Sequence, residues 1–299
     1  MEGRRILITG PTSTVGLPVT LALAERNEVV GVARFGDAAA RERLEAAGVR
    51  CVPLDLATAT ADDLAAVPGD VDHVVNFAIA RGSDADWDRD LAANGEAVGL
   101  LMQHCRSARS VLHCSSTAVY QPAGAHPVVE TDPLGDNHRA MFATYSIAKI
   151  ASEVVARTAC RQFGVPTTIA RLNVPYGDHG GWPWFHLKMM EAGIPIPVHS
   201  DRPNLFNPIH SDDIVRQVPL LLDVATVPAT IVNWAGAPAA LEEWCALVGE
   251  LTGLTPEFTE TDATIASVTT DNTRMHALIG PAEIDWRAGI TRMVEANRA

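Results

Sequence analysis

The sequence predicts an α/β protein with a doubly wound parallel sheet and a smaller C-terminal lobe. Short β-branched runs alternate with helical patterns through the first two-thirds of the chain. A glycine-containing stretch follows the first apolar run and opens the first helical pattern. The regular alternation stops near Tyr176, where Trp, Pro and Gly cluster. Strands separated by helices of this length pair in parallel through right-handed crossovers, so helices should cover both faces of the sheet.

The expected elements follow one another along residues 4–173. Strands are expected where Val, Ile and Leu dominate a short run, and helices where Ala, Leu, Arg and Glu recur at helical spacing. The expected strands are 4–10, 27–34, 49–56, 72–80, 110–116 and 166–173. The expected helices are 16–26, 37–48, 60–67, 91–107 and one that begins near Tyr145. Ligands of such sheets bind at the carboxyl ends of the strands.

Composition excludes several classes of partner and location. The 299 residues, 47% of them hydrophobic, can bury a large core, and the net charge of −13 without a Lys/Arg run argues against nucleic acid. Five cysteines without a CxxC pair indicate reduced thiols and no metal site. The first residues run straight into an apolar strand, and Asp223 and two prolines interrupt the most apolar late segment. We therefore expect no signal peptide, no membrane partner and a cytoplasmic location.

The stretch "ITGPTSTVGLPV" predicts a dinucleotide-binding turn. Gly10 permits a tight turn, Gly16 lets the helix pack closely on the strand, and the helix N-terminus offers N–H groups to a pyrophosphate. Ser13 stands where a middle glycine is usual and could add a hydroxyl donor to the phosphates. An ordinary strand-to-helix turn is the alternative.

The end of the second strand bears on the choice of cofactor. An NAD site usually places Asp or Glu there for the ribose 2′-hydroxyl, but this chain has Ala33 followed by Arg34. A guanidinium can bind a 2′-phosphate in a fork, so we predict NADP(H), with NAD as the alternative if Arg34 is only a solvated loop residue. Asp55, after the third strand, is placed to reach the adenine. Asn76 and Ala78 end the fourth strand, where the backbone would pass close to the cofactor.

"YSIAK" places a phenol and an ammonium four positions apart. Such a pair is either an unremarkable helix surface or a catalytic tyrosine whose pKa a neighbouring positive charge lowers. Ser116, at the end of a sheet strand, favours the catalytic reading, because strand ends point at the ligand crevice. We predict that Ser116 holds a substrate oxygen, Tyr145 moves its proton, and Lys149 tunes Tyr145 and binds ribose hydroxyls.

Five motifs in this order resemble the extended short-chain dehydrogenases/reductases, which include sugar-nucleotide epimerases and dehydratases. They are "TGxxSxxG", "SSTAVY", "YSIAK", "RLNVPYG" and "IHSDD", and the resemblance spans residues from about 4 to 290. It implies a Rossmann domain, a C-terminal substrate lobe and hydride transfer at nicotinamide C4. It also implies homodimers formed through the helices that hold Asn94 and Tyr145. The family's pattern identifies Ser116, rather than Ser115 or Thr117, as the catalytic serine. The "HSDD" portion reads as structural, with Ser211 or Asp212 capping the helix that follows.

Two departures from the family's pattern concern the substrate. Sugar-nucleotide members commonly have an arginine four residues before the histidine of "IHSDD", but Phe206 stands there, and Val174 takes the place of a usual asparagine. Losing a phosphate clamp would cost about 2–5 kcal/mol. If the motif is aligned with a small shift, the adjacent Asn173 takes the place of the usual asparagine. Side chains that could compensate for the missing arginine are Arg202, Lys188 and His199.

A cluster of apolar side chains could take the place of the phosphate clamp. Met141, Phe142, Trp182, Trp184, Phe185 and Phe206 lie in the segments where the resemblance places the substrate pocket. Each could simply fill the core of the small lobe. If two or three of them face the crevice, they would suit an aromatic or polyketide-like carbonyl compound.

These inferences divide the chain and assign its site residues. Residues 1–175 form the dinucleotide-binding Rossmann domain, and residues 176–299 mostly form the substrate lobe, with segments near 205–235 returning to the first domain. The expected cofactor contacts are Gly10, Thr12, Ser13, Thr14, Val15, Gly16, Arg34, Asp55, Leu56, Phe77, Ala78, Tyr145, Lys149, Asn173 and Pro175. The expected substrate contacts are Thr117, Phe142, Trp182, Trp184 and Phe206.

The expected function is an NADP(H)-dependent oxidoreductase that interconverts a carbonyl and an alcohol on a small, non-nucleotide substrate. The alternative is a sugar-nucleotide epimerase or dehydratase that recycles its cofactor. A third possibility is a redox-sensing regulator without chemistry, although such a protein has no need of the Ser, Tyr and Lys set.

Overall fold

A computed structural model describes residues 1–80 and 86–298 of the chain. Its centre is a seven-stranded sheet in the order β12-β6-β5-β4-β1-β2-β3, and every neighbouring pair is parallel. The strands are β1 (Arg5–Thr9), β2 (Glu28–Ala33), β3 (Arg50–Pro53), β4 (His73–Asn76), β5 (Ser110–Ser116), β6 (Thr167–Leu172) and β12 (Thr230–Trp234). The predicted doubly wound architecture is confirmed.

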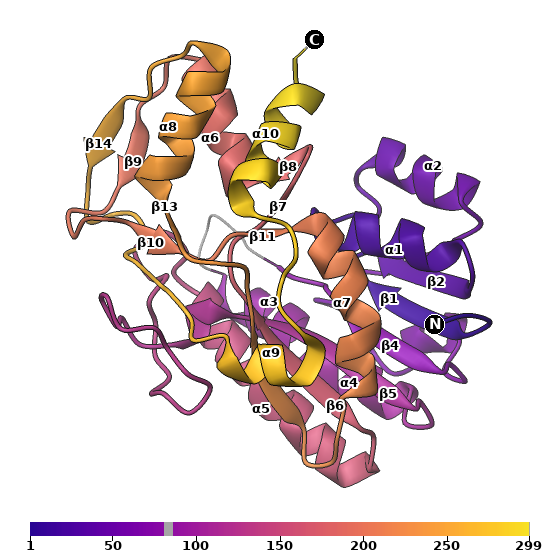
Figure 1. The fold of residues 1–299 in the computed structure, drawn as a ribbon. Helices are drawn as coiled ribbons and strands as arrows, with labels where there is room; N and C mark the ends of the chain where they lie inside the picture. The colour runs from indigo at the N-terminus through magenta and orange to yellow at the C-terminus, as the bar shows by residue number, and fades with distance from the viewer. Residues whose placement is uncertain (81–85, 299) are drawn as a thin grey trace.

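Helices cover both faces of the sheet, as Figure 1 shows. Successive side chains of a strand point to opposite faces, so Ile6 and Ile8 pack on one side and Leu7 on the other. One face carries α1 (Gly16–Ala24), α2 (Ala38–Ala46), α7 (Ser211–Asp223) and α9 (Thr273–Ile279). The other carries α4 (Ala97–His104) and α5 (Tyr145–Phe163).

Two connections differ from the expected helices. The expected helix at 60–67 is only the short 3-10 helix η1 (Asp63–Ala66). The expected helix at 91–107 starts earlier and has three parts: α3 (Trp87–Leu91), the π-helical turn η2 (Ala92–Glu96) and α4. The 3-10 turn η3 (Thr117–Val119) follows β5 directly.

The small lobe lies at the carboxyl ends of the strands, at the upper left of Figure 1. Its own core includes Trp244, Phe206 and Ile290. Its helices are α6 (Trp182–Glu191), α8 (Leu241–Thr252) and α10 (Trp286–Ala296). Its short strands are β7 (Pro175–Gly177), β8 (Gly180–Gly181), β9 (Ile196–Val198), β10 (Leu205–Phe206), β11 (Ile209–His210), β13 (Ala239–Ala240) and β14 (Phe258–Glu260).

The chain returns to the sheet after it has entered the small lobe. α7 packs on the same face as α1, and β12 pairs with β6. The cap of α7 differs from the expectation: His210, rather than Ser211 or Asp212, is the N-cap and accepts a hydrogen bond from the Asp212 N–H. Asp213 is structural, because its carboxylate accepts from the backbone N–H groups of Glu283 and Ile284.

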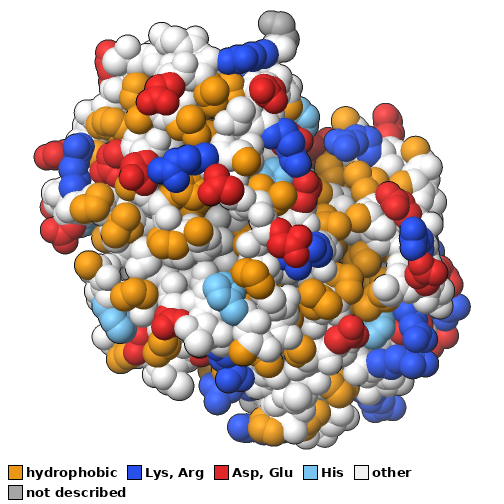
Figure 2. Space-filling view, in the orientation of Figure 1, with side chains coloured by type: hydrophobic (Ala, Val, Ile, Leu, Met, Phe, Trp, Pro, Cys, Tyr) orange, Lys and Arg blue, Asp and Glu red, His pale blue; other side chains and the backbone are white. Residues whose placement is uncertain are grey.

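Acidic and basic side chains are interspersed on the face shown in Figure 2. The five cysteines are unpaired, and all but Cys51 are buried. Within residues 1–80 and 86–298, no helix is long and apolar enough to cross a membrane.

Candidate active site

A cavity of about 840 Å³ lies between the carboxyl ends of the strands and the small lobe. Its wall includes the loop 12–15 between β1 and α1, the ends of β5 and β6, and the start of α5. The small lobe contributes α6, β10 and residues 264–268. The cavity therefore connects the predicted dinucleotide turn with the predicted substrate lobe.

The glycine-containing loop is tightly built. Gly10 has φ +66°, and a Cβ there would lie 2.9 Å from the backbone of Phe77 and Ala78. A Cβ at Gly16 would lie 2.1 Å from the Gly10 carbonyl oxygen. The Ser13 hydroxyl donates to the Gly10 carbonyl at 2.8 Å and accepts from the Gly16 N–H at 2.9 Å. That hydroxyl therefore braces the loop, in place of the phosphate contact expected of it.

The residues expected at the adenosine end lie outside the cavity wall. Arg34 is exposed after β2, and Asp55 forms an ion pair with Arg89 at 2.9 Å. Burial acts to raise the pKa of Asp55, but the hydrogen bonds from Arg89 and Ala57 and the charges of Arg89 and Arg34 hold it below its usual value. Leu56 packs against the apolar core beneath α4 and α5.

Ser116, Tyr145 and Lys149 all line the cavity. Ser116 is the last residue of β5, and its Oγ accepts from the Ala118 N–H at 3.1 Å. Tyr145 is the first residue of α5, and Lys149 lies one turn later with only 4% of its surface exposed. Lys149 Nζ donates to the Cys114 carbonyl at 2.8 Å. Contact between β5 and α5 thus brings the phenol, the ammonium and the hydroxyl to one space.

A buried hydrogen-bond chain anchors α5 to the sheet behind these residues. Thr9 Oγ1 donates to Asn76 Oδ1 at 2.5 Å, and Asn76 Nδ2 contacts His113 Nδ1 at 3.0 Å. His113 Nε2 contacts Ser152 Oγ at 2.9 Å, and this hydroxyl donates to the Lys149 carbonyl. Burial, aided by the charge of Lys149, lowers the pKa of His113 to about 3, so this imidazole is neutral and holds its proton on Nε2.

His138 is a cavity residue that the sequence analysis missed. Asn137 Nδ2 donates to the Thr117 carbonyl at 3.0 Å, so Asn137 Oδ1 faces His138 Nδ1 and must accept from it. In the neutral ring, Nε2 is therefore the acceptor nitrogen. The His138 and Tyr145 rings lie 5.8 Å apart. No helix or strand lies within residues 121–144, so no periodic pattern could predict where His138 is placed.

One face of α6 forms the small-lobe wall. The side chains on this face recur at helical spacing and are Trp182, Phe185, His186 and Met189. Trp184 points the other way: its Nε1 donates to Asn297 Oδ1 at 3.0 Å, and it does not line the cavity. Trp184 therefore departs from its expected place, because helical geometry separates it from Trp182.

Most of the predicted site residues come together. Those that line the cavity are Thr12, Ser13, Thr14, Val15, Phe77, Ser116, Thr117, Phe142, Tyr145, Lys149, Asn173, Pro175, Trp182 and Phe206. Those that do not are Gly10, Gly16, Arg34, Asp55, Leu56, Ala78 and Trp184. Lining residues that sequence reasoning did not single out include His138, His186, Asn204, Thr264, Ile265 and Val268.

The described wall carries little fixed charge. Lys149 is the one Lys or Arg in it, and the described lining residues include neither Asp nor Glu. Arg202 pairs with Glu260 at 3.2 Å, and Lys188 pairs with Glu191 at 2.9 Å, both outside the cavity wall.

Asn173 lines the cavity, but its side-chain amide is already engaged. Its Nδ2 donates to the Val268 carbonyl at 2.9 Å, and its Oδ1 accepts from the Val174 N–H. His199 Nδ1 accepts from the Asp201 N–H at 3.1 Å, so all of the residues proposed from the sequence for a phosphate clamp make other contacts in the structure.

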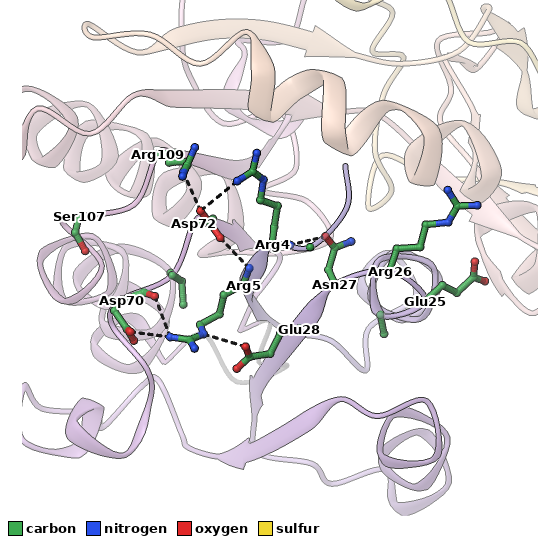
Figure 3. Close-up of a pocket in the computed structure, with 13 residues that line it drawn as sticks. Arg4, Arg5, Glu25, Arg26, Asn27, Glu28, Asp70, Asp72, Ser107 and Arg109 are labelled. Carbon is green, nitrogen blue, oxygen red and sulfur yellow. Dashed lines mark hydrogen bonds and ion pairs between the residues drawn. The ribbon is translucent and has the colours of Figure 1, made fainter.

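A second hollow lies at the amino ends of the strands (Figure 3). Its charged side chains pair with one another: Arg5 contacts Glu28 and Asp70, and Asp72 lies between Arg4 and Arg109. These pairs neutralise the hollow, which is therefore a weaker candidate than the cavity at the carboxyl ends.

Comparison with known families decides the relationship. The model of the "NAD dependent epimerase/dehydratase family" matches residues 6–234, which is more than half of the chain. The chain belongs to this family. It is thus an NAD(P)-dependent enzyme of the extended short-chain dehydrogenase/reductase type, as its motifs predicted.

Solved structures show the same fold over nearly the whole chain. UDP-glucose 4-epimerase from Thermotoga maritima has a TM-score of 0.84 at 18% identity, covering 98% of each chain. UDP-glucuronic acid 4-epimerase from Bacillus cereus, with NAD and UDP-glucuronic acid, has a TM-score of 0.83 at 16% identity and 98% coverage of each chain. The dTDP-glucose 4,6-dehydratase from Streptomyces venezuelae, with NAD, has a TM-score of 0.82 at 22% identity, covering 98% of this chain and 97% of that one. A comparison with curated protein sequences finds no match.

Proposed function

We propose that this enzyme transfers a hydride between a bound nicotinamide cofactor and an alcohol or carbonyl carbon of a small-molecule substrate. The supporting observation is that Ser116, Tyr145 and Lys149 line the same cavity as the loop 12–15. When bound, the nicotinamide accepts or gives the hydride. The tight loop at Gly10 and Gly16 and the N-terminus of α1 suit a pyrophosphate in that part of the cavity.

Each side chain of the triad has a separate role in the proposal. In the oxidative direction, the Tyr145 phenolate takes the hydroxyl proton of the substrate, and in reduction the phenol returns it. The Lys149 ammonium stabilises the phenolate and binds ribose hydroxyls. The Ser116 hydroxyl makes no hydrogen bond as a donor among the described residues, so it can donate to the substrate oxygen and stabilise charge there.

The solved relatives favour one version of this reaction, in which a sugar nucleotide is oxidised and reduced again with the cofactor recycled. They are sugar-nucleotide epimerases and dehydratases. Within this version, epimerisation fits better than dehydration. Elimination of water from a hydroxy ketone needs an acid and a base beside the ring carbons, and the described cavity wall offers no carboxylate for either role.

A second version, net oxidation or reduction of a non-nucleotide substrate, is supported by the charge of the wall. A diphosphate buried between the two lobes needs cations, and Lys149 is the one Lys or Arg among the described lining residues. The aromatic rings of Trp182 and Phe206, 5.2 Å apart, would instead pack against an apolar substrate.

Tyr145→Phe tests the shared chemistry. We expect turnover to fall by at least about 100-fold while cofactor binding is kept, because the phenolic proton carrier is lost. Unchanged activity would reject hydride transfer through Tyr145 and would favour a cofactor-binding regulator. Two assays separate the versions. Net consumption of NADPH with a panel of carbonyl compounds would support the non-nucleotide version. Isomerisation of UDP-glucose without net cofactor consumption would support the sugar-nucleotide version.

The choice of cofactor, the assembly and the location belong to the same proposal. We propose NADP(H), on the strength of Arg34, with NAD as the alternative, and NAD is the cofactor in the solved relatives named above that contain one. We also propose a homodimer formed through the helix that holds Asn94, which is η2 continuing into α4, and through α5, where Val154 and Ile147 are exposed. The cytoplasmic location rests on the sequence alone.

A further inference from the structure

His186 is a polar side chain in the small-lobe wall whose proton position is fixed by its surroundings. It is 8% exposed and lies on the face of α6 that lines the cavity. Trp244 Nε1 donates to His186 Nδ1 at 2.9 Å, and the two rings are nearly parallel, with 15° between their planes. An indole nitrogen can only donate, so Nδ1 must be the acceptor and Nε2 must carry the proton.

The Nε2–H group of His186 is available to a ligand. Among the described residues it has no hydrogen-bond partner. It is also not one of the fully buried unpartnered atoms, which are Asp136 Oδ1 and Arg216 Nε. An unpartnered donor in a mostly buried side chain that borders a cavity must reach the open space of that cavity.

The surroundings of His186 are uncharged. Burial lowers its pKa to about 4, so the ring supplies no positive charge near neutral pH. Thr264 is also 8% exposed in the same wall, and its hydroxyl has no partner within the described chain. The remaining small-lobe wall is mostly apolar, with Trp182, Phe206 and Ile265.

We propose that the small-lobe half of the cavity binds an uncharged, ring-containing group of the substrate, and that His186 selects it by donating Nε2–H to an oxygen acceptor such as a carbonyl. Thr264 offers a second hydrogen bond to the same group. This inference rests on the proposed hydride-transfer site, since it places the far end of that site's substrate. A buried donor without an acceptor is costly, so a substrate lacking the oxygen would be rejected.

The first test uses the histidine signals of the enzyme saturated with NADP⁺ and reads no activity. Imidazole ¹⁵N spectra, with His186→Gln for assignment, should show His186 neutral and protonated on Nε2 at pH 6–8. Acetophenone and uridine, two neutral probes with ring-linked carbonyls, should shift that signal. UDP, which adds only the diphosphate to uridine, should bind no more tightly than uridine.

The outcomes that would overturn the proposal are distinct. They are an Nδ1–H tautomer, no shift with either neutral probe, or UDP binding at least tenfold more tightly than uridine. Failure of hydride transfer would appear separately, as unchanged turnover in Tyr145→Phe, and would leave these spectra unaffected.

Two variants separate donation from packing. His186→Phe keeps a ring but removes the donor, and it should weaken binding of the neutral probe that shifts the signal by about threefold to tenfold. His186→Gln can accept from Trp244 and still donate, so it should retain most of the affinity. Both should bind NADP⁺ like the parent, because His186 is not part of the turn at residues 10–16 that is proposed to hold the pyrophosphate. An equal loss of probe affinity in both variants, or no loss of probe affinity in His186→Phe, would contradict selection by the Nε2–H donor.

Discussion

At the scale of single residues, Tyr145 can be observed directly because the chain has only three tyrosines. Burial raises the pKa of Tyr120 to about 12, and it also raises the pKa of Tyr176. A phenolate that forms below pH 10 therefore belongs to Tyr145. We expect Lys149→Met to raise the pKa of Tyr145, because the nearby positive charge is lost. Near-ultraviolet phenolate absorbance against pH measures it.

Two controls make this titration specific to Tyr145. Tyr145→Phe should remove the transition below pH 10 altogether. Arg139→Met removes an exposed positive charge from the segment before α5 and should leave the midpoint in place. A Lys149→Met midpoint equal to that of the parent would show that the ammonium does not act on the phenol.

Arg34 carries the prediction for cofactor choice. We expect Arg34→Ser to weaken NADPH binding by about tenfold and to leave NADH binding within about twofold, because only the 2′-phosphate needs the guanidinium. Calorimetric titration of both cofactors measures the ratio. Arg26→Ser removes an exposed arginine near the amino ends of the strands and is the matched control. Equal loss of NADPH and NADH affinity would contradict the argument.

Single residues were predictable where a motif fixes their backbone position. Gly10, Gly16, Ser116, Tyr145 and Lys149 stand in short stretches whose local geometry follows from the sequence. Ser13 shows the limit of such reasoning, since the sequence could not reveal that its hydroxyl is used inside the loop. His138 lies in an irregular segment, and His186 is oriented by Trp244, which is distant in the sequence. No local sequence pattern predicts either placement.

At the scale of elements, a buried ion pair joins α5 to β6. Arg171 Nη2 and Glu153 Oε2 lie 2.8 Å apart, and each side chain is 2% exposed. The Ser115 hydroxyl also donates to Glu153 Oε1, which ties in β5. Burial by itself would lower the pKa of Arg171, but its hydrogen bonds and charge interaction with Glu153 raise it. The pair therefore holds α5 on the sheet.

Breaking this ion pair on one side should destabilise the fold. We expect Arg171→Met to lower the free energy of unfolding by about 3–5 kcal/mol, because it leaves the Glu153 carboxylate buried without a counter-charge. Arg171→Met combined with Glu153→Gln should cost less than Arg171→Met alone. Urea denaturation monitored by circular dichroism measures both, and equal losses in the single and double variants would contradict the ion-pair explanation.

The case of α6 shows why aromatic residues near one another in sequence need not share a site. Reading "WPWF" as a cluster placed Trp182 and Trp184 together, but they differ by two helical positions and so point about 160° apart. A helical reading of residues 182–191 groups Trp182 with His186 and Met189, as the structure does. Knowing that this segment is a helix would have removed Trp184 and added His186.

At the scale of the whole molecule, the large sheet was predictable and the small lobe was not. The sheet follows from periodicity, because parallel strands buried on both faces give continuous apolar runs. All seven described strands of the small lobe have only two or three residues, too few to show a period. The lobe core forms from residues spread between Tyr176 and Val294, so its shape depends on long-range packing.

Buried neutral histidines should make the stability of the whole fold depend on pH. The folded pKa is about 3 for His113 and about 4 for His186, and burial also lowers the pKa of His73 and His210. An unfolded histidine titrates near pH 6.5. Between these values the unfolded chain binds protons that the folded chain does not, so this stability is present above pH 6.5 and is lost as the pH falls toward 4.

Each fully buried histidine contributes a slope of about 1.4 kcal/mol per pH unit in that window. From pH 7 to pH 5, His113 and His186 together should therefore remove on the order of 4 kcal/mol from the free energy of unfolding. Denaturant titrations at half-unit pH steps measure the loss. His113→Gln should reduce the slope of the unfolding free energy against pH by the amount that corresponds to about one proton. His179→Gln, at an exposed position, should not change that slope. A constant free energy of unfolding from pH 7 to pH 5 would mean that these rings protonate in the folded protein, which would also break the hydrogen bond from Trp244 Nε1 to His186 Nδ1 that fixes the His186 proton on Nε2.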